Sequence, residues 1–207
     1  MSSVPETAPQ SAVLRYSNTA VAFHWITVVL VLAQAIVGFG FHRFSEGALK
    51  AELFTWHKTI GPVILLLAVA RLWYRLKNPP PPFPPELPGW ERISAVWNHR
   101  LFYTLLIAMP LVGLAAISGG AEEPTTTLAG GIPFPLIPGI SKQTGDLLGE
   151  IHMVAAWLLV ASILIHVAAA LKHQFVDRWR GSARMPPFSS FGEPVAIGQG
   201  GESVRED

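Results

Sequence analysis

Four long apolar stretches dominate the pattern of hydrophobic and polar positions along the chain. They cover residues 19–41, 55–76, 100–120 and 151–172, and charged residues are sparse inside them. A helix needs about 20 apolar residues to cross a bilayer core about 30 Å thick, so each stretch is long enough to span one. The pattern therefore predicts an all-α integral membrane protein, a bundle of four transmembrane helices in the lipid bilayer.

The segments outside these stretches define the remaining organisation. Residues 1–18 form a polar leader that lacks the features of a cleaved signal peptide, so we expect the first helix to stay attached. Residues 19–180 form one four-helix domain, and a proline-rich segment at 78–88 predicts a stiff, polyproline-like connection. Residues 181–207 are rich in glycine and polar residues and predict a disordered tail.

Composition supports the membrane setting and excludes several classes of protein. Hydrophobic residues make up 50% of the chain and charged residues 14%, whereas a soluble domain has about 25% charged residues. The chain has no cysteine, which excludes iron–sulfur clusters, covalently attached haem and disulfides. A net charge of +1 argues against a nucleic acid partner, because phosphate binding needs a basic surface.

The basic residues predict the orientation in the membrane. With both termini in the cytoplasm, eleven of the 15 lysines and arginines fall in inner segments and four in outer segments, which agrees with the positive-inside rule. The inner residues are Arg15, Arg71, Arg75, Lys77, Arg92, Arg100, Lys172, Arg178, Arg180, Arg184 and Arg205, and the outer residues are Arg43, Lys50, Lys58 and Lys142.

Four histidines, at positions 24, 57, 152 and 166, lie inside the apolar stretches. His152 and His166 are fourteen residues apart on the predicted fourth helix. At about 1.5 Å and 100° per residue, this spacing separates them by about 21 Å and returns them to nearly the same face. Ionisable residues at membrane depth are rare and usually functional.

The predicted depths of these histidines match in pairs. His24 lies near the cytoplasmic start of the first helix and His166 near the cytoplasmic end of the fourth, whereas His57 and His152 both lie near the outer side. Any one of them could be an ordinary structural histidine. Two matched levels favour two b-type haems between the helices, with the pairs His24/His166 and His57/His152 as axial ligands of the iron.

Three further histidines need separate interpretations. His173 is seven residues beyond His166, again on the same face, and could replace it as a ligand. The spacing from His152 would then be about 31 Å, which would leave both irons at the headgroup level, so we favour His166. His42 and His99 fall at predicted helix ends, where we expect them to face water.

The stretches that carry these histidines resemble the bacterial cytochrome b561 family over roughly residues 14–180. The resemblance rests on RYSNTAVAFHW, LFTWHKTIGPVILLLAVARLWYRL, HRLFYTLLIAMPLVGL and EIHMVAAWLLVASILIHVAAALKHQF. It implies a four-helix protein of the bacterial inner membrane with two b haems, and some members are superoxide oxidases that pass the electron to ubiquinone. The implied ligands are His24, His57, His152 and His166, and His173 corresponds to a histidine near the quinone end in members of the superoxide-oxidase type.

Other residues could contact a bound haem or a substrate. Arg71 and Arg75 at the inner end of the second helix and Lys58 at its outer end are candidate partners of haem propionates, although each could instead reach lipid headgroups. The outer segment at 121–150 contains the apolar run LAGGIPFPLIPGI. It could form a lid over the outer haem, a docking surface for a partner, or an interfacial segment lying on lipid.

The favoured function is electron transfer from a donor at the outer face, superoxide, to the ubiquinone pool. The outer segments carry four basic and six acidic residues, whereas an anionic substrate is steered by a positive field. A local patch of Arg43, Lys50 and Lys58 could still supply that field. One alternative is a haem-bearing membrane anchor and electron-relay subunit of a dehydrogenase or hydrogenase, which predicts a stable partner subunit. Another is a non-redox transporter whose histidines bind a metal or protons. A homo-oligomer is compatible with each of these functions.

Overall fold

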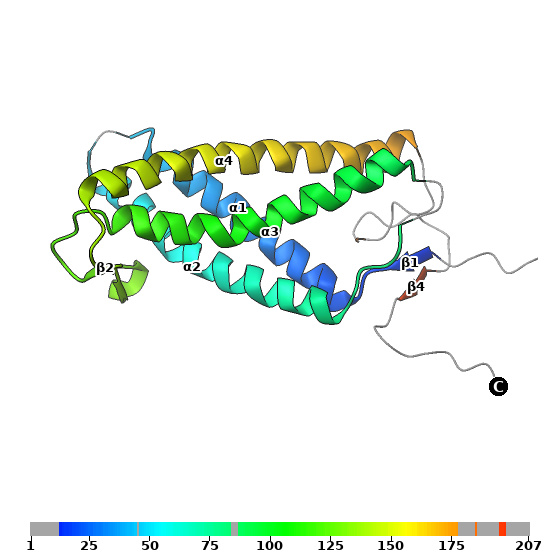
Figure 1. The fold of residues 1–207 in the computed structure, drawn as a ribbon, viewed down its shortest axis with the longest axis horizontal. Coiled ribbons are helices and arrows are strands. Elements are labelled where there is room, and N and C mark those ends of the chain that lie inside the picture. Colours follow the sequence, from blue (N-terminus) through cyan, green and yellow to red (C-terminus); the bar gives the residue numbers. More distant parts are fainter. Residues whose placement is uncertain (1–12, 45, 84–86, 178–184, 186–194, 198–207) are drawn as a thin grey trace, which may run out of the picture.

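Four long helices dominate the computed structural model, which describes residues 13–44, 46–83, 87–177, 185 and 195–197 (Figure 1). All four are long and apolar enough to cross a membrane, which confirms the predicted four-helix bundle. They are α1 (Asn18–Phe41), α2 (Ala48–Lys77), α3 (Gly89–Ile117) and α4 (Lys142–Leu171), and a π-helical turn, η2 (Lys172–Val176), continues α4.

Three helices begin earlier than the apolar stretches predicted. α2 begins seven residues before position 55, α3 eleven residues before position 100, and α4 nine residues before position 151. The apolar run marks the part of a helix that lies in hydrocarbon, but the helix itself continues until a capping residue ends it. Ser141, for example, caps α4 by accepting a hydrogen bond from the Thr144 backbone N–H.

The helices associate as two close pairs. α1 packs along α2, α3 packs along α4, and α2 contacts α3 to join the pairs (Figure 1). α3 and α4 approach most closely at Gly119 and Gly145, where a Cβ atom added to Gly119 would lie 2.5 Å from the Gly145 Cα. Small residues permit this kind of close helix contact in membranes. Within the described residues, α1 and α4 make much less backbone contact, and cavities lie between them.

The buried core is small and lies near the middle of the bundle. Ile64 and Ala68 of α2 and Leu106 of α3 form its centre, with exposed fractions of 5%, 1% and 7%. Many other large apolar side chains, such as Ile36 and Leu66, point outward, as expected where lipid covers the protein. The core therefore separates two less densely packed ends of the bundle.

The first and last described strands lie at one end of the bundle, which we call the terminal end (Figure 1). There, β1 (Val13–Arg15) pairs in parallel with β4 (Val195–Ile197). The predicted disordered tail at 181–207 lies largely outside the described residues, but β4 is part of it and forms a strand. The proline-rich connection has no regular secondary structure at 78–83, and its residues 84–86 lie outside the described ranges.

The opposite end, which we call the hairpin end, is covered by a folded segment. β2 (Thr125–Thr127) and β3 (Pro133–Pro135) form an antiparallel hairpin around a short 3₁₀ turn, η1 (Ala129–Gly131). The Ala129 N–H donates a hydrogen bond to Thr59 Oγ1 at 2.9 Å, and the Ile137 N–H donates one to Ser118 Oγ at 3.0 Å. These bonds attach the segment to α2 and α3.

Candidate haem sites

At the terminal end, a histidine of α1 faces a histidine of α4. The ring centroids of His24 and His166 are 6.4 Å apart, and both side chains are half-buried. They line a cavity of about 820 Å³ that is also lined by Arg71 and Arg75. Phe102 packs edge-on against the His166 ring at 5.4 Å between centroids. This cavity lies between the two helix pairs.

At the hairpin end, a second pair of histidines joins α2 to α4. The ring centroids of His57 and His152 are 5.9 Å apart, and the two rings are nearly perpendicular, at 82°. They line a smaller cavity of about 110 Å³. Leu106 of the central core lines both cavities, so one thin apolar layer separates them.

The spacing within each pair fits a metal held between two imidazoles. A metal–nitrogen bond of about 2.0 Å on each side, with about 1.1 Å from nitrogen to ring centre, places two axial imidazole centroids about 6.2 Å apart. The observed centroid separations of 6.4 and 5.9 Å bracket that value. The separations therefore fit an iron between the two imidazoles of each pair.

Two glycines make room for the histidines of the hairpin end. A Cβ atom on Gly38 of α1 would lie 2.9 Å from the His57 ring, and one on Gly113 of α3 would lie 3.1 Å from the His152 ring. Real Cβ atoms almost never approach as closely as the first distance. Each imidazole therefore occupies a notch that only glycine leaves in the neighbouring helix.

The two rings differ in their hydrogen bonding. His152 Nδ1 lies 3.1 Å from the Met109 carbonyl oxygen, a contact that holds the ring and leaves Nε2 for a metal. The Gln34 side-chain amide donates to the His57 carbonyl at 3.1 Å and lies 3.3 Å from His57 Nε2. His57 Nδ1 is buried without a hydrogen-bond partner among the described residues. Buried polar atoms without partners cost about 1–3 kcal/mol each, so they often mark sites that an ion or ligand completes.

Of the three candidate propionate partners, two lie in the terminal-end cavity. Arg71 Nη2 is 3.3 Å from His24 Nδ1, and the guanidinium groups of Arg71 and Arg75 both lie 5.8 Å from the centre of the Tyr103 ring. The third, Lys58, points elsewhere: its Nζ donates a hydrogen bond to Thr126 Oγ1 at 2.7 Å. Lys58 therefore links α2 to the hairpin, and it does not line either cavity.

His99 is a correction to the sequence analysis. We expected it to face water at a helix end, but α3 begins ten residues earlier, at Gly89, so His99 lies inside the helix and lines the terminal-end cavity. Its ring centroid is 5.6 Å from that of His166, and its Nδ1 is 2.7 Å from the Ala95 carbonyl oxygen. The position of His99 inside the helix follows from the start of α3 at Gly89, which the apolar pattern did not predict.

The two remaining histidines differ in exposure. His42 is exposed at the end of α1, as expected, and its ring stacks near Phe41. His173 is half-buried in η2, where its Nδ1 lies 2.7 Å from Asp177 Oδ2. His173 also lines the terminal-end cavity, but its closest polar partners are carboxylates.

Comparison with known proteins assigns this arrangement to a family. The sequence profile of the prokaryotic cytochrome b561 family matches residues 15–187. Cytochrome b561 homolog 2 of Escherichia coli (strain K12) is 29% identical over 168 residues, covering 79% of this chain and 87% of that protein. The probable superoxide oxidase CybB of Yersinia pestis is 26% identical over 173 residues, covering 84% and 96%. Cytochrome b561 homolog 1 of E. coli (strain K12) is 26% identical over 179 residues, covering 84% and 97%.

Four membrane-spanning helices that bring histidines together in two facing pairs define the architecture of a membrane cytochrome. The chain belongs to the prokaryotic cytochrome b561 family, which confirms the resemblance noted in the sequence. It is therefore a haem b protein of electron transport and an integral protein of the bacterial inner membrane.

Proposed function

We propose that the chain binds two haem b groups, one at each end of the bundle, and carries electrons across the membrane between them. The observation that supports this most directly is the pairing of both α4 histidines, His152 with His57 and His166 with His24. Haem b supplies reversible one-electron chemistry when bound. His24 with His166 and His57 with His152 would hold the two groups, so substrates would exchange electrons at the edge of each site.

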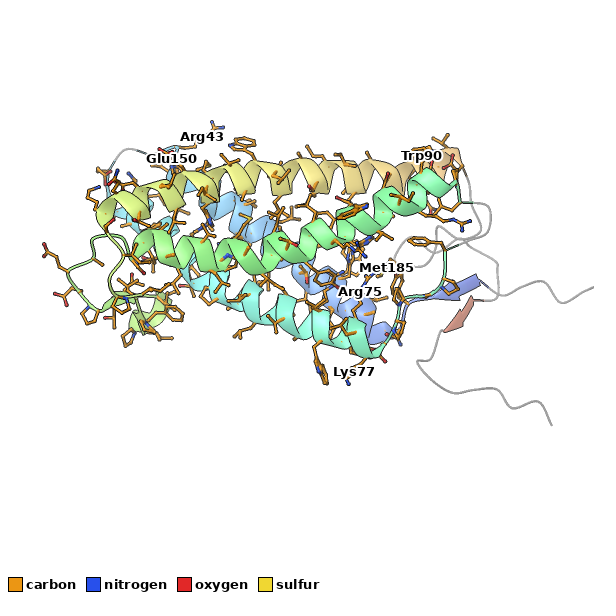
Figure 2. All side chains as sticks on the ribbon, viewed as in Figure 1. Arg43, Arg75, Lys77, Trp90, Glu150 and Met185 are labelled. Atoms are coloured by element: carbon orange, nitrogen blue, oxygen red, sulfur yellow. The ribbon has the colours of Figure 1, made fainter. Side chains whose placement is uncertain are left out.

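Arg71 and Arg75 would hold the propionate groups at the terminal end. Both guanidinium groups line the cavity that contains His24 and His166, and guanidinium forms strong paired hydrogen bonds with carboxylates. Figure 2 shows Arg75 on the terminal-end side of the bundle together with Met185, which lines the same cavity, whereas Arg43 and Glu150 lie at the other end. The terminal-end site is thus the one with internal cations.

We infer that superoxide is the donor at the hairpin end and ubiquinone the acceptor at the terminal end. Two superoxide anions would each lose one electron to become O₂, and one ubiquinone would take up the two electrons with two protons to become ubiquinol. The similarity to a probable superoxide oxidase supports the donor. The rim of the 820 Å³ cavity supports the acceptor, because Glu91 and His173 line it apart from the two histidines that would hold the haem.

The orientation belongs to the same proposal. The excess of lysine and arginine in the segments at the terminal end supports placing that end, with both termini, in the cytoplasm. The hairpin end then faces outward, where superoxide would arrive. Ubiquinone would be reduced near the inner surface, where protons are taken from the cytoplasm.

Stopped-flow mixing of the purified, haem-replete protein with superoxide tests this function. We expect the reduced α-band to appear within milliseconds and to decay when a short-chain ubiquinone is added. Superoxide dismutase in the mixture should abolish the reduction, which serves as the control. A protein that dithionite reduces but superoxide does not would exclude superoxide as the donor.

One observation favours a second donor, a partner subunit. The patch predicted to attract superoxide, Arg43, Lys50 and Lys58, is partly neutralised, because Lys50 forms an ion pair with Glu46. Lys142, another basic residue of the outer segments, forms an ion pair with Asp146. A relay subunit of a dehydrogenase or hydrogenase would receive electrons through a protein contact and would need no positive field. Purification from native membranes in a mild detergent would retain such a partner, whereas a single polypeptide that oxidises superoxide would argue against it.

A further inference from the structure

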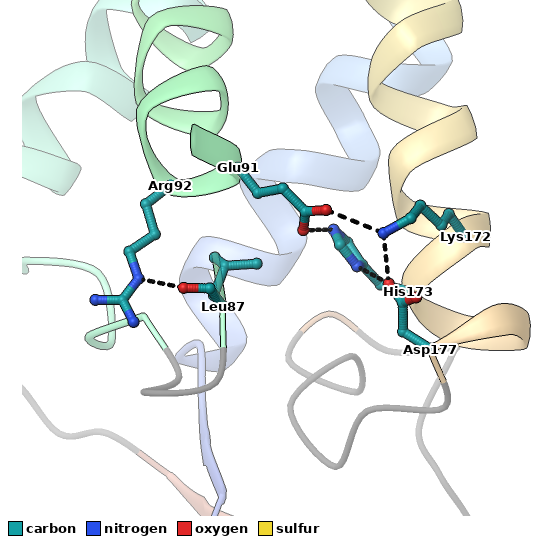
Figure 3. Close-up of polar contacts among 6 residues, drawn as sticks. All are labelled: Leu87, Glu91, Arg92, Lys172, His173 and Asp177. Atoms are coloured by element: carbon teal, nitrogen blue, oxygen red, sulfur yellow. Dashed lines mark hydrogen bonds and ion pairs between the residues drawn. The ribbon is translucent and has the colours of Figure 1, made fainter. Parts of the chain in front are cut away.

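A cluster of four polar side chains joins α3 to the end of α4 at the rim of the terminal-end cavity (Figure 3). Glu91 comes from the first turn of α3, Lys172 and His173 from η2, and Asp177 from the residue after it. His173 Nδ1 lies 2.7 Å from Asp177 Oδ2, and His173 Nε2 lies 3.6 Å from Glu91 Oε2. One imidazole therefore stands between two carboxylates from different helices.

The three side chains in this row lead from the surface to the cavity. The side chain of Asp177 is 25% exposed and that of His173 is 24% exposed, whereas that of Glu91 is only 10% exposed. Glu91 and His173 line the cavity, but Asp177 does not. A carboxylate, an imidazole and a second carboxylate thus follow one another inward.

The cluster contains an imidazole, His173, that is not needed to link the two helices by ion pairs. Lys172 Nζ alone contacts both carboxylates, at 3.0 Å from Glu91 Oε1 and 2.8 Å from Asp177 Oδ2, so it ties the two helices without the imidazole. Glu91, Asp177 and Lys172 together carry a formal charge of −1, which favours the passage of a cationic proton. An imidazole can accept a proton at one ring nitrogen and release it from the other.

The local backbone and the neighbouring charges keep the Asp177 carboxylate able to accept a proton. Hydrogen bonds from Lys172 and His173 hold the pKa of Asp177 below its ordinary value, so it stays an acceptor near neutral pH. His173 lies in the π-helical turn and Asp177 directly follows it, and the two side chains are in contact. Turns of this kind are frequent at functional sites. The neighbouring Arg92 donates from Nε to the Leu87 carbonyl at 2.8 Å, on the other side of Glu91 (Figure 3).

We propose that Asp177, His173 and Glu91 form a proton-uptake relay for a quinone reduced in the terminal-end cavity. The inference rests on the proposed function, since each quinone that takes two electrons also binds two protons and its carbonyl oxygens become hydroxyls. A proton taken up at Asp177 passes to His173 Nδ1, another leaves His173 Nε2 for Glu91, and Glu91 delivers it toward the quinone oxygen. The electrons come from the donor through the two histidine pairs.

The test uses the full-length protein with its haem, reduced anaerobically with a small amount of dithionite and then mixed with a short-chain ubiquinone. Glu91→Gln and His173→Phe should each slow reoxidation at least tenfold and raise the solvent isotope effect, with the haem content and reduced spectrum unchanged. Glu150→Gln at the hairpin end is the matched carboxylate control.

Rescue separates proton transfer from a structural role. Added imidazole should restore part of the rate lost in His173→Gly, which a missing helix contact would not allow. Wild-type reoxidation rates in Glu91→Gln and His173→Phe, or an equal loss in Glu150→Gln, would overturn the relay. If ubiquinone fails to reoxidise the wild-type protein itself, the proposed function fails, and the relay fails with it.

Discussion

The two ends of the bundle carry similar histidine pairs in different surroundings. At the terminal end, the rings of His24 and His166 line a cavity of about 820 Å³ together with two arginines. At the hairpin end, the rings of His57 and His152 are pressed against glycines beside a cavity of about 110 Å³. Similar histidine pairs therefore lie once beside a large cavity with two arginines and once beside a small, mostly apolar cavity.

This difference suggests different tasks for the two sites. The large cavity has the volume and the cations to accept a bulky carrier beside a redox group, and the relay side chains lie at its rim. The small cavity has no such space, so a donor at the hairpin end must give its electron from the surface. A small one-electron donor suits this site, whereas a quinone suits the other.

The largest effect is expected from removing a candidate ligand. His152→Ala should lower the haem content from two groups per chain to about one, because the iron at the hairpin end loses an axial nitrogen. His24→Ala should have the same effect at the terminal end and leave the hairpin-end spectrum in place. Pyridine haemochrome assays and difference spectra of the two variants would measure both the number and the identity of the remaining site.

Two other histidines in the large cavity serve as controls for this experiment. His99→Ala and His173→Ala should keep both haem groups, since the closest polar partners of these rings are the Ala95 carbonyl and the Asp177 carboxylate. A His166→Ala variant with a wild-type spectrum, combined with haem loss in His173→Ala, would transfer the ligand role to His173.

Much of the fold could be predicted from the sequence because hydrophobic length reports directly on membrane crossing. The helical rise sets the depth of each histidine, and these depths pair His24 with His166 and His57 with His152. The helix starts could not be predicted this way, since polar turns continue a helix beyond the lipid. That error moved His99 to a helix end.

The rest of the candidate site depends on contacts between segments far apart in the chain. Lys58 and Arg71 are both basic residues near the ends of α2, and nothing in the local sequence distinguishes one that holds the hairpin from one that lines the cavity. From the sequence, Gly38 and Gly113 could let a porphyrin approach the backbone closely or could serve helix packing in the membrane. The structure shows that each of these glycines faces an imidazole ring, that of His57 or that of His152.

The second prediction concerns these two notches and sharpens the contrast between the ends. Gly38→Ala would place a methyl group 2.9 Å from the His57 ring, and Gly113→Ala would place one 3.1 Å from the His152 ring. Overpacking of this kind costs about 1–3 kcal/mol. We expect weaker haem retention on heating at the hairpin end, with Gly38→Ala the more affected, and an unchanged terminal-end spectrum.

Gly40→Ala is the matched control, because its methyl group would meet only Leu53 Cδ1, at an ordinary 3.6 Å. Thermal release of haem from this variant should follow the wild type. Equal loss in Gly40→Ala and Gly38→Ala would mean that the substitutions disturb α1 in general, and the proposed notch for His57 would then be wrong.

The smallest effect is expected from the cations of the large cavity. Arg71 lies beside His24, and its positive charge favours the reduced state of a redox centre there. A unit charge about 8 Å away at an effective dielectric constant of about 20 contributes about 2 kcal/mol. Since about 1.4 kcal/mol corresponds to about 59 mV for one electron, Arg71→Gln should lower the terminal-end midpoint potential by about 40–90 mV.

Redox titration followed by optical spectroscopy would resolve this shift from the potential of the hairpin-end site, which should stay constant. Arg100→Gln is a suitable control, because Arg100 is an exposed arginine of α3 that stacks on Trp97, 5.1 Å from the ring centre. Equal shifts at both ends would show that Arg71 acts through the general field of the protein. A shift confined to the terminal end would identify Arg71 as part of that site, and would explain how one pair of ligands can hold a higher potential than the other.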